Sequence, residues 1–235
     1  MPHRWCNSAD VRREQIESGK DITFNEVFKP LFIKRIIALS PSHVLDVGAG
    51  TGHISKELAS CGLKVTAIEP SQGMYKVAKE VLSGDNVELI NCTAFELANS
   101  KIFDVAFSNM VAHVTDDLIA FFCSVKDHLV RGGHFIFSIP HPCFYNEYKG
   151  FFGQEYSYME TKTKDVTFTI TKDSENDIIG VPYHHRPLSK YLNDLVRSGF
   201  TIDRFHEIYP DDKIQAMYGK RWKSPRYCVF TCKKL

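Results

Sequence analysis

Short apolar runs alternate with longer amphipathic segments from about residue 43 onward. Within one such segment Met74, Val77 and Val81 recur at helical spacing and define one face. Strands are expected at residues 43–47, 64–69, 87–91, 103–108 and 134–139. This alternation predicts an α/β fold with a doubly wound, parallel sheet and crossover helices.

The alternation breaks after residue 139, where aromatic and polar side chains become frequent. Two period-2 runs, at 166–171 and 178–183, predict a hairpin whose turn lies at 173–177. A connection of this length is often a functional lid. We therefore divide the chain into a helical N-terminal cap segment (1–40), a core (41–142), a lid insertion (143–186) and a return to the core sheet (187–235).

Composition narrows the class of protein. The 235 residues carry a formal net charge of +1, and no stretch is dense in Lys and Arg, which disfavours a DNA-binding protein. Seven scattered cysteines without CxxC spacing make a disulfide framework or a zinc site improbable, and we expect no metal. The N-terminus lacks a signal-peptide core and no run is long enough to span a membrane, so we expect a cytoplasmic enzyme.

The most informative stretch runs from Val44 to His53, where a buried strand ends in Asp46 and turns through three glycines. Glycines let the backbone approach a ligand closely, and the helix that follows offers free N–H groups. The spacing is G-x-G-x-G, whereas dinucleotide sites use G-x-G-x-x-G. His53 stands where a third dinucleotide glycine would be needed, so a cofactor without a pyrophosphate is favoured.

Glu69 ends the second strand, nineteen residues beyond Gly50. An acid at this place can accept hydrogen bonds from both hydroxyls of a ribose. Ser71 is a plausible N-cap for the next helix, and Met74 can lie beneath an adenine or belong to the core. The two strand ends together predict a nucleoside-type cofactor.

At this point the sequence resembles the class I S-adenosylmethionine (SAM) dependent methyltransferases, and most closely the small-molecule branch that includes ubiquinone- and menaquinone-type enzymes. The resemblance rests on residues 46–52, the Glu-Pro-Ser-x-x-Met pattern from Glu69, Phe103-Asp104-Val105, and the Gly-Gly turn at 132–133. It implies a seven-stranded Rossmann-like sheet whose last strand is antiparallel, with SAM as cofactor and S-adenosylhomocysteine as product.

The resemblance also implies roles for individual residues. One departure is that Thr93 stands where the family usually has an acid for the adenine amino group. The predicted cofactor residues are Asp46, Gly48, Ala49, Gly50, Glu69, Pro70, Gln72, Met74, Thr93, Ala94, Phe95, Asn109 and Met110.

Three histidines near the carboxyl ends of strands or at the edge of the insertion are candidate general bases: His113, His141 and His184. Imidazole suits this work because its ordinary pKa is near 6.5. Each can equally be a hydrogen-bonded structural residue. The acceptor is expected against Tyr145, Tyr156, Tyr183 and His185, although the aromatic rings of the insertion can also form the lid's own small core.

The expected activity is transfer of a methyl group to an O or N atom of a small, possibly aromatic, molecule by a monomer or homodimer without DNA or membrane partners. Two alternatives stay open. The first is a tRNA or protein methyltransferase, for which a basic face would be built from Arg197, Arg204, Lys220, Arg221, Lys223 and Arg226. The second is a protein that binds SAM without catalysis.

Overall fold

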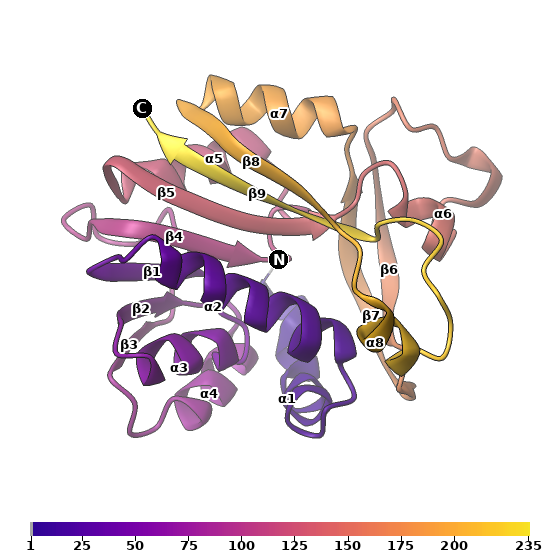
Figure 1. The fold of residues 1–235 in the computed structure, drawn as a ribbon, viewed down its shortest axis with the longest axis horizontal. Helices are drawn as coiled ribbons and strands as arrows, with labels where there is room; N and C mark the ends of the chain where they lie inside the picture. Colours follow the sequence, from indigo (N-terminus) through magenta and orange to yellow (C-terminus); the bar gives the residue numbers. More distant parts are fainter. Residues whose placement is uncertain (1) are drawn as a thin grey trace.

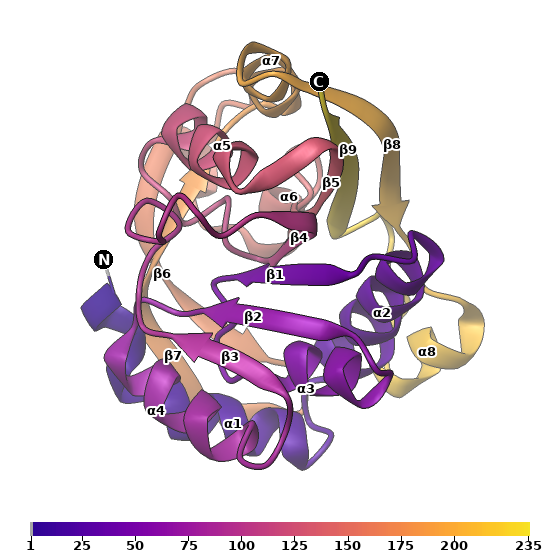
Figure 2. The same ribbon diagram turned by 90° about the vertical axis from the view of Figure 1, so that its left-hand side faces the viewer.

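The computed structural model describes residues 2–235, with side chains from Trp5 onward. Seven strands form one sheet in the order β3-β2-β1-β4-β5-β9-β8 (Figures 1 and 2). Strand β9 is antiparallel to both of its neighbours, and the other core strands from β3 to β5 are parallel. The strands are β1 (His43–Val47), β2 (Lys64–Ile68), β3 (Val87–Ile90), β4 (Phe103–Asn109), β5 (Leu129–Pro140), β8 (Phe200–Ile208) and β9 (Tyr227–Lys234). The predicted fold class is confirmed.

Helices cover both faces of this sheet (Figure 2). Successive strand residues point to opposite faces, so Val44 packs with α2 and α3 whereas Leu45 packs with α5 and α7. Because both faces are covered, most residues of the central strands β1 and β4 are buried, and most of their positions are apolar. The helices are α2 (Lys29–Ala38), α3 (His53–Ser60), α4 (Gln72–Val81), α5 (Leu118–Asp127) and α7 (Leu188–Arg197).

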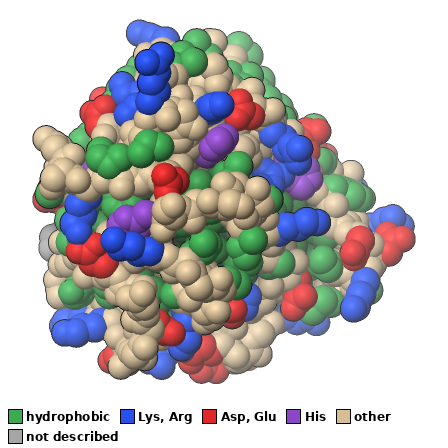
Figure 3. All heavy atoms as spheres, turned by 60° about the vertical axis from the view of Figure 1, so that its left-hand side comes forward, with side chains coloured by type: hydrophobic (Ala, Val, Ile, Leu, Met, Phe, Trp, Pro, Cys, Tyr) green, Lys and Arg blue, Asp and Glu red, His purple; other side chains and the backbone are tan. Residues whose placement is uncertain are grey.

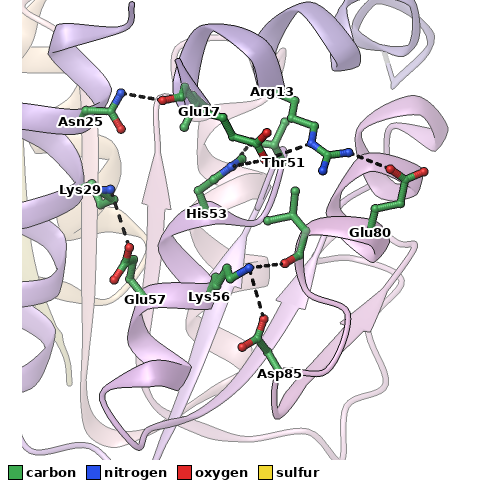
Figure 4. Close-up of polar contacts among 12 residues, drawn as sticks. Arg13, Glu17, Asn25, Lys29, Thr51, His53, Lys56, Glu57, Glu80 and Asp85 are labelled. Carbon is green, nitrogen blue, oxygen red and sulfur yellow. Dashed lines mark hydrogen bonds and ion pairs between the residues drawn. The ribbon is translucent and has the colours of Figure 1, made fainter. Parts of the chain in front are cut away.

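The N-terminal segment packs across α3 and α4. It consists of η1 (Pro2–Ser8), α1 (Ala9–Glu17) and η2 (Thr23–Phe28), a π-helical turn that continues into α2. Figure 4 shows Arg13 of α1 bonded to Glu80 at 2.8 Å, and Glu17 lies 3.4 Å from the His53 ring nitrogen. A Cβ atom on Gly73 would lie 2.2 Å from the Cys6 carbonyl oxygen, so only glycine lets η1 approach the start of α4.

The insertion after β5 forms a separate two-stranded sheet of β6 (Lys162–Ile170) and β7 (Asp173–His185), preceded by α6 (Tyr145–Lys149) and η3 (Gly153–Glu155). The predicted turn at 173–177 is wrong, because the chain turns at 171–172 and the polar stretch belongs to β7. Its first residue, Asp173, is buried and accepts a hydrogen bond from Gln15 at 3.0 Å. The N-terminal segment thus satisfies polar groups that would otherwise favour a turn.

One short helix, α8 (Asp212–Met217), joins β8 to β9 (Figure 1). Within residues 2–235, no helix combines the length and apolar character needed to cross a membrane.

Candidate active site

A cavity of about 520 Å³ opens at the carboxyl ends of β1, β2 and β4. The strand order reverses between β1 and β4, and doubly wound sheets bind ligands at such a switch point. The sheet side of this cavity consists of residues 46–51, 68–71, 74, 92–95 and 109–111. The cap side consists of lining residues from the N-terminal segment, α6, the β6–β7 hairpin and the chain around β9.

The glycine loop after β1 shapes the sheet side. Gly48, Gly50 and Gly52 all have positive φ, at 73°, 58° and 81°, a region that side chains with a Cβ rarely adopt. A Cβ on Gly48 would also meet the Val111 side chain at 2.6 Å, whereas nothing lies within 4 Å of one on Gly50. The loop therefore needs glycine for its path and leaves open space over Gly50 for a ligand.

Glu69 holds this loop in place. Its Oε2 accepts a hydrogen bond from the Gly50 N–H at 2.8 Å, and its Oε1 accepts one from the Ser71 N–H at 2.7 Å. Ser71 in turn caps α4 by accepting a hydrogen bond from the Met74 N–H at 3.5 Å, as predicted. Each carboxylate oxygen keeps a second lone pair, so Glu69 can still accept hydrogen bonds from a ligand.

Two carboxyl groups are buried side by side beneath the loop. Burial raises the pKa of Asp46 to about 7, against a hydrogen bond from Ser55 at 2.7 Å that lowers it. Burial likewise raises the pKa of Glu69 to about 7, against the two backbone hydrogen bonds. Both groups therefore change charge near neutral pH, and a cationic ligand would stabilise their ionised forms.

The remaining predicted cofactor residues divide between the cavity and the surface. Pro70 and Met74 line the cavity, and so do Thr93, Ala94 and Phe95 after β3. The hydroxyl of Thr93, the residue in the place of the family's acid, donates a hydrogen bond to Glu96 at 2.8 Å. Gln72 is exposed, and the cavity wall does not include it.

The end of β4 is held in a strained conformation. Met110 has φ of +60°, which is uncommon for a residue other than glycine and clusters at functional sites. Its N–H donates a hydrogen bond to the Ser138 hydroxyl at 3.0 Å, and that hydroxyl donates one to Asn109 at 2.7 Å. Asn109 and Met110 both line the cavity.

His113 is the one predicted catalytic histidine that reaches the cavity. It is buried, and within the described part of the chain its Nδ1 has no hydrogen-bond partner. Burial, together with the charge of Arg186, lowers the pKa of His113 to about 3. Its imidazole is therefore neutral at physiological pH and can accept or donate one further hydrogen bond.

The structure places the other two histidines away from the cavity wall. His141 is buried at the end of β5, with Nε2 2.9 Å from Glu207 and Nδ1 accepting a hydrogen bond from the Cys143 N–H at 3.2 Å. His184 bonds to Thr163 at 2.8 Å and lies 3.3 Å from Asp116. Both have the contacts of structural residues.

The four predicted acceptor residues also lie outside the cavity wall. Tyr145 and Tyr183 pack against each other, with ring centroids 5.9 Å apart, and border a second cavity of about 20 Å³. Tyr156 and His185 pack edge to face with centroids 5.0 Å apart. These rings belong to the core of the insertion.

The sequence analysis missed most of the cap side. Its aromatic wall comes instead from the N-terminal segment, α6, β6 and the C-terminal region: Trp5, Phe24, Phe28, Tyr148, Phe168, Tyr218 and Tyr227. Four cationic side chains border the same region: Arg12, Lys20, Lys149 and Arg226. The assignments of residues 1–40 as a cap and 143–186 as a lid were the predictions that pointed to this side of the cavity.

Two of the six basic residues proposed for a basic face have other partners in the structure. Arg226 lies against aromatic rings at the cavity, and Arg221 pairs with Asp212 at 2.8 Å. On the face drawn in Figure 3, basic and acidic side chains are interspersed.

Comparison with known proteins agrees with this geometry. Residues 45–137 match the family model described as a methyltransferase domain. Residues 45–137 of the chain thus carry a methyltransferase domain. An uncharacterized methyltransferase from Bacillus thuringiensis (strain Al Hakam) is 32% identical to this chain over 116 residues. The matched segment covers 48% of this chain and 52% of the relative. The chain thus matches about half the length of that relative.

Solved structures share the fold of this methyltransferase domain. A SAM-dependent methyltransferase from Mesorhizobium loti superposes with a TM-score of 0.62 at 21% identity, covering 82% of this chain and 90% of that one. The 1,6-didemethyltoxoflavin N1-methyltransferase from Burkholderia thailandensis superposes with a TM-score of 0.59 at 18% identity, covering 96% of this chain and 86% of that one. At these identities the likeness concerns the fold.

The sheet side of the cavity fits SAM, the cofactor of this family. A volume of about 520 Å³ is within the range of small-molecule sites. The buried carboxyl groups of Asp46 and Glu69 match the cationic and hydroxyl groups of SAM, and the open space over Gly50 allows close approach. The described residues thus provide both the charge and the room that SAM needs.

Proposed function

We propose that the protein transfers the methyl group of SAM to an oxygen or nitrogen atom of a small molecule that binds on the cap side of the cavity. The observation that carries this proposal is the continuity of the cavity, which is lined by Asp46 and Glu69 as well as by Phe168 and Tyr218. A cofactor on the sheet side and an acceptor on the cap side would therefore meet within this one cavity.

In this proposal Glu69 accepts hydrogen bonds from the ribose, and Asp46, Gly48 and Gly50 surround the methionine portion. Pro70, Met74, Ala94 and Phe95 border the adenine. SAM, when bound, supplies an activated methyl group on its sulfonium. The protein's remaining task is to align the acceptor atom with that group and keep water away.

His113 is the group that we assign to the acceptor atom. A neutral imidazole can accept a hydrogen bond from an O–H or N–H group and so orient its lone pair. Because the His113 pKa is lowered to about 3, the side chain holds this form across the physiological pH range. We therefore assign His113 the role of positioning the acceptor with its neutral imidazole, which is not protonated in the ligand-free protein at physiological pH.

The walls of the cap side support a small acceptor. Residues from the N-terminal segment and from the insertion both border it, which fits our assignment of 1–40 as a cap and 143–186 as a lid. Phe24, Phe168 and Tyr218 offer ring surfaces to an aromatic molecule. The Burkholderia neighbour is named for a small acceptor, which shows that this fold can serve one.

The cofactor assignment is tested by calorimetry with SAM, S-adenosylhomocysteine and NADH. We expect binding of the first two ligands and no heat with NADH. Binding of NADH alone would contradict the assignment.

The acceptor assignment is tested with SAM tritiated on its methyl group. The protein is incubated separately with a small-metabolite pool, bulk tRNA and unfolded protein, and the label is followed in each fraction. We expect transfer to a small molecule that depends on Glu69. Label in tRNA or protein would overturn the acceptor class, and SAM binding without any transfer would indicate a non-catalytic binder.

A further inference from the structure

The cap side of the cavity holds four cationic side chains, of which two are neutralised. Arg12 pairs with Asp21 at 2.8 Å, and Lys20 lies 3.3 Å from Asp173. Neither Lys149 nor Arg226 has a carboxylate within ion-pair distance among the side chains of residues 5–235. The cap side therefore carries two uncompensated positive charges.

The cationic groups of Lys149 and Arg226 both lie near the aromatic ring of Tyr148. The Arg226 guanidinium lies 3.7 Å from the centroid of Tyr148 and 4.4 Å from that of Trp222. The Lys149 ammonium lies 5.2 Å from the same Tyr148 ring. Helix α6 and the chain before β9, which supply them, meet at one end of the molecule in Figure 1.

The aromatic rings fix the guanidinium by contacting its faces, and among residues 5–235 no protein group accepts a hydrogen bond from the N–H groups at its edge. The Arg226 carbonyl accepts a hydrogen bond from the His141 N–H at 2.8 Å, so its backbone is held as well. A planar guanidinium held in this way is suited to bind a carboxylate or phosphate through two parallel hydrogen bonds.

The pKa of the Lys149 ammonium reflects the same excess of positive charge. Burial lowers its pKa, and the charge of Arg226 lowers it further, whereas Asp177 raises it. Two like charges held together in a partly buried place disfavour each other, and an anion between them would stabilise both.

We propose that Lys149 and Arg226 form an anion site that selects methyl acceptors carrying a carboxylate, phosphate or sulfate group. This inference rests on the proposed function and names its substrate class: a small, largely apolar molecule with one anionic group. Tyr148 supports both cations, and the rest of the acceptor lies among the aromatic rings of the cap side. The buried carboxyl groups of Asp46 and Glu69 lie on the sheet side of the cavity. On the cap side, the carboxylate of Asp21 is paired with Arg12 at 2.8 Å.

The test uses two fluorescent probes that differ in one charge. Anilinonaphthalene sulfonate carries a sulfonate, and phenylnaphthylamine has the same rings without it. Both are titrated into wild-type protein saturated with S-adenosylhomocysteine. We expect the sulfonate to bind at least about tenfold more tightly, the scale for hydrogen bonds to a charged group.

The double variant Lys149→Gln with Arg226→Gln should bring the two probes within about threefold of each other and leave phenylnaphthylamine affinity unchanged. Arg221→Gln with Lys172→Gln removes two charges from exposed positions and should keep the wild-type preference. Should the double variant fold poorly, Lys149→Gln alone should lower the preference at least about threefold, and Arg226→Lys should retain part of it.

Equal affinity for both probes in the wild type, or an unchanged preference in the double variant, would overturn the anion site. Calorimetry with S-adenosylhomocysteine separates this failure from that of the proposed function. A wild type that does not bind S-adenosylhomocysteine contradicts the proposed function, and the probe ratio measured without that ligand still decides the anion site.

Discussion

The Gly50 N–H donates a hydrogen bond to the buried Glu69 carboxylate across 2.8 Å, and this contact joins the glycine loop after β1 to the end of β2. The two residues are nineteen positions apart in the chain. Their contact fixes the loop before any ligand arrives and leaves lone pairs of the carboxylate available. Preorganisation of this kind reduces the ordering cost of binding.

Replacing Glu69 with Ala should therefore weaken SAM binding by about 2 kcal/mol or more, the scale for losing hydrogen bonds to a charged group. The loss includes the ribose contacts and the support of the loop. Calorimetry with S-adenosylhomocysteine measures it directly. We expect the variant to stay folded, because Glu69 lies at a strand end and its removal leaves no charge unpaired in the core.

Glu57→Ala on α3 is the matched control, since Glu57 is exposed and its carboxylate lies 3.8 Å from the Lys29 ammonium. Its cofactor affinity should equal that of the wild type. Wild-type affinity in Glu69→Ala as well would mean that Glu69 does not contact the ribose.

The raised pKa values of Asp46 and Glu69 predict how stability depends on pH. Both carboxyl groups have a pKa of about 7 in the folded protein and near 4 in an unfolded chain. The folded state therefore binds more protons in this window, and the free energy of unfolding falls as the pH rises from about 4 to about 7. We expect a loss of about 5 kcal/mol, or about 10 °C in Tm, between about pH 5 and pH 8 for the ligand-free protein.

Scanning calorimetry of Asp46→Asn should show a flatter pH dependence than the wild type, because the amide does not ionise and still accepts the Ser55 hydrogen bond. Asp127→Asn, at an exposed position on α5, should leave the wild-type slope. A Tm that rises through this window in the wild type would contradict the assignment.

The glycine loop and Glu69 were predictable because their chemistry is local. A positive φ requires glycine whatever surrounds it, and an acid at the end of a parallel strand necessarily lies at the ligand-binding edge. Gln72 shows the limit of this reasoning, since it lies on the surface although Met74, two positions later in the first turn of α4, lines the cavity.

The cap side was not predictable in the same way, because long-range packing decides which rings face it. Tyr145 and Tyr148 lie on the same short helix, yet Tyr145 packs into the core and Tyr148 borders the cavity. Arg226, which the sequence suggested as part of a basic surface, turns onto Tyr148 because β9 returns beside α6. His141 follows the end of a strand, where ligand-binding residues often lie, but its imidazole Nε2 is hydrogen-bonded to Glu207 of β8.

His113 should affect turnover more than binding of the cofactor. His113→Ala removes the hydrogen-bonding group that we assign to the acceptor. We expect kcat to fall about tenfold or more, a smaller loss than for a general base because His113 positions the acceptor. The affinity for S-adenosylhomocysteine should change by less than about threefold.

His141→Ala serves as the comparison, since its ring contacts Glu207 and lies outside the cavity wall. It should lower Tm and spare kcat per folded molecule. The reverse pattern, with kcat lost in His141→Ala and kept in His113→Ala, would show that the wrong histidine has been assigned.

Phe168 tests whether the hairpin binds the acceptor. Its ring lines the cavity from β6 and lies 5.4 Å from the Arg12 guanidinium, so truncation opens the cap side without touching the glycine loop. Phe168→Ala should raise KM for the acceptor about tenfold, close to the value of burying part of one aromatic side chain, and keep SAM affinity within about threefold. Ile179→Ala is the control on the same hairpin, because the Ile179 side chain is 77% exposed and its truncation should leave both KM and SAM affinity unchanged.

Steady-state kinetics with the acceptor found in the labelling experiment measure KM, and calorimetry measures the affinity for SAM. If KM stays at the wild-type value while the variant remains folded, the hairpin is scaffold and the acceptor binds against the N-terminal segment instead.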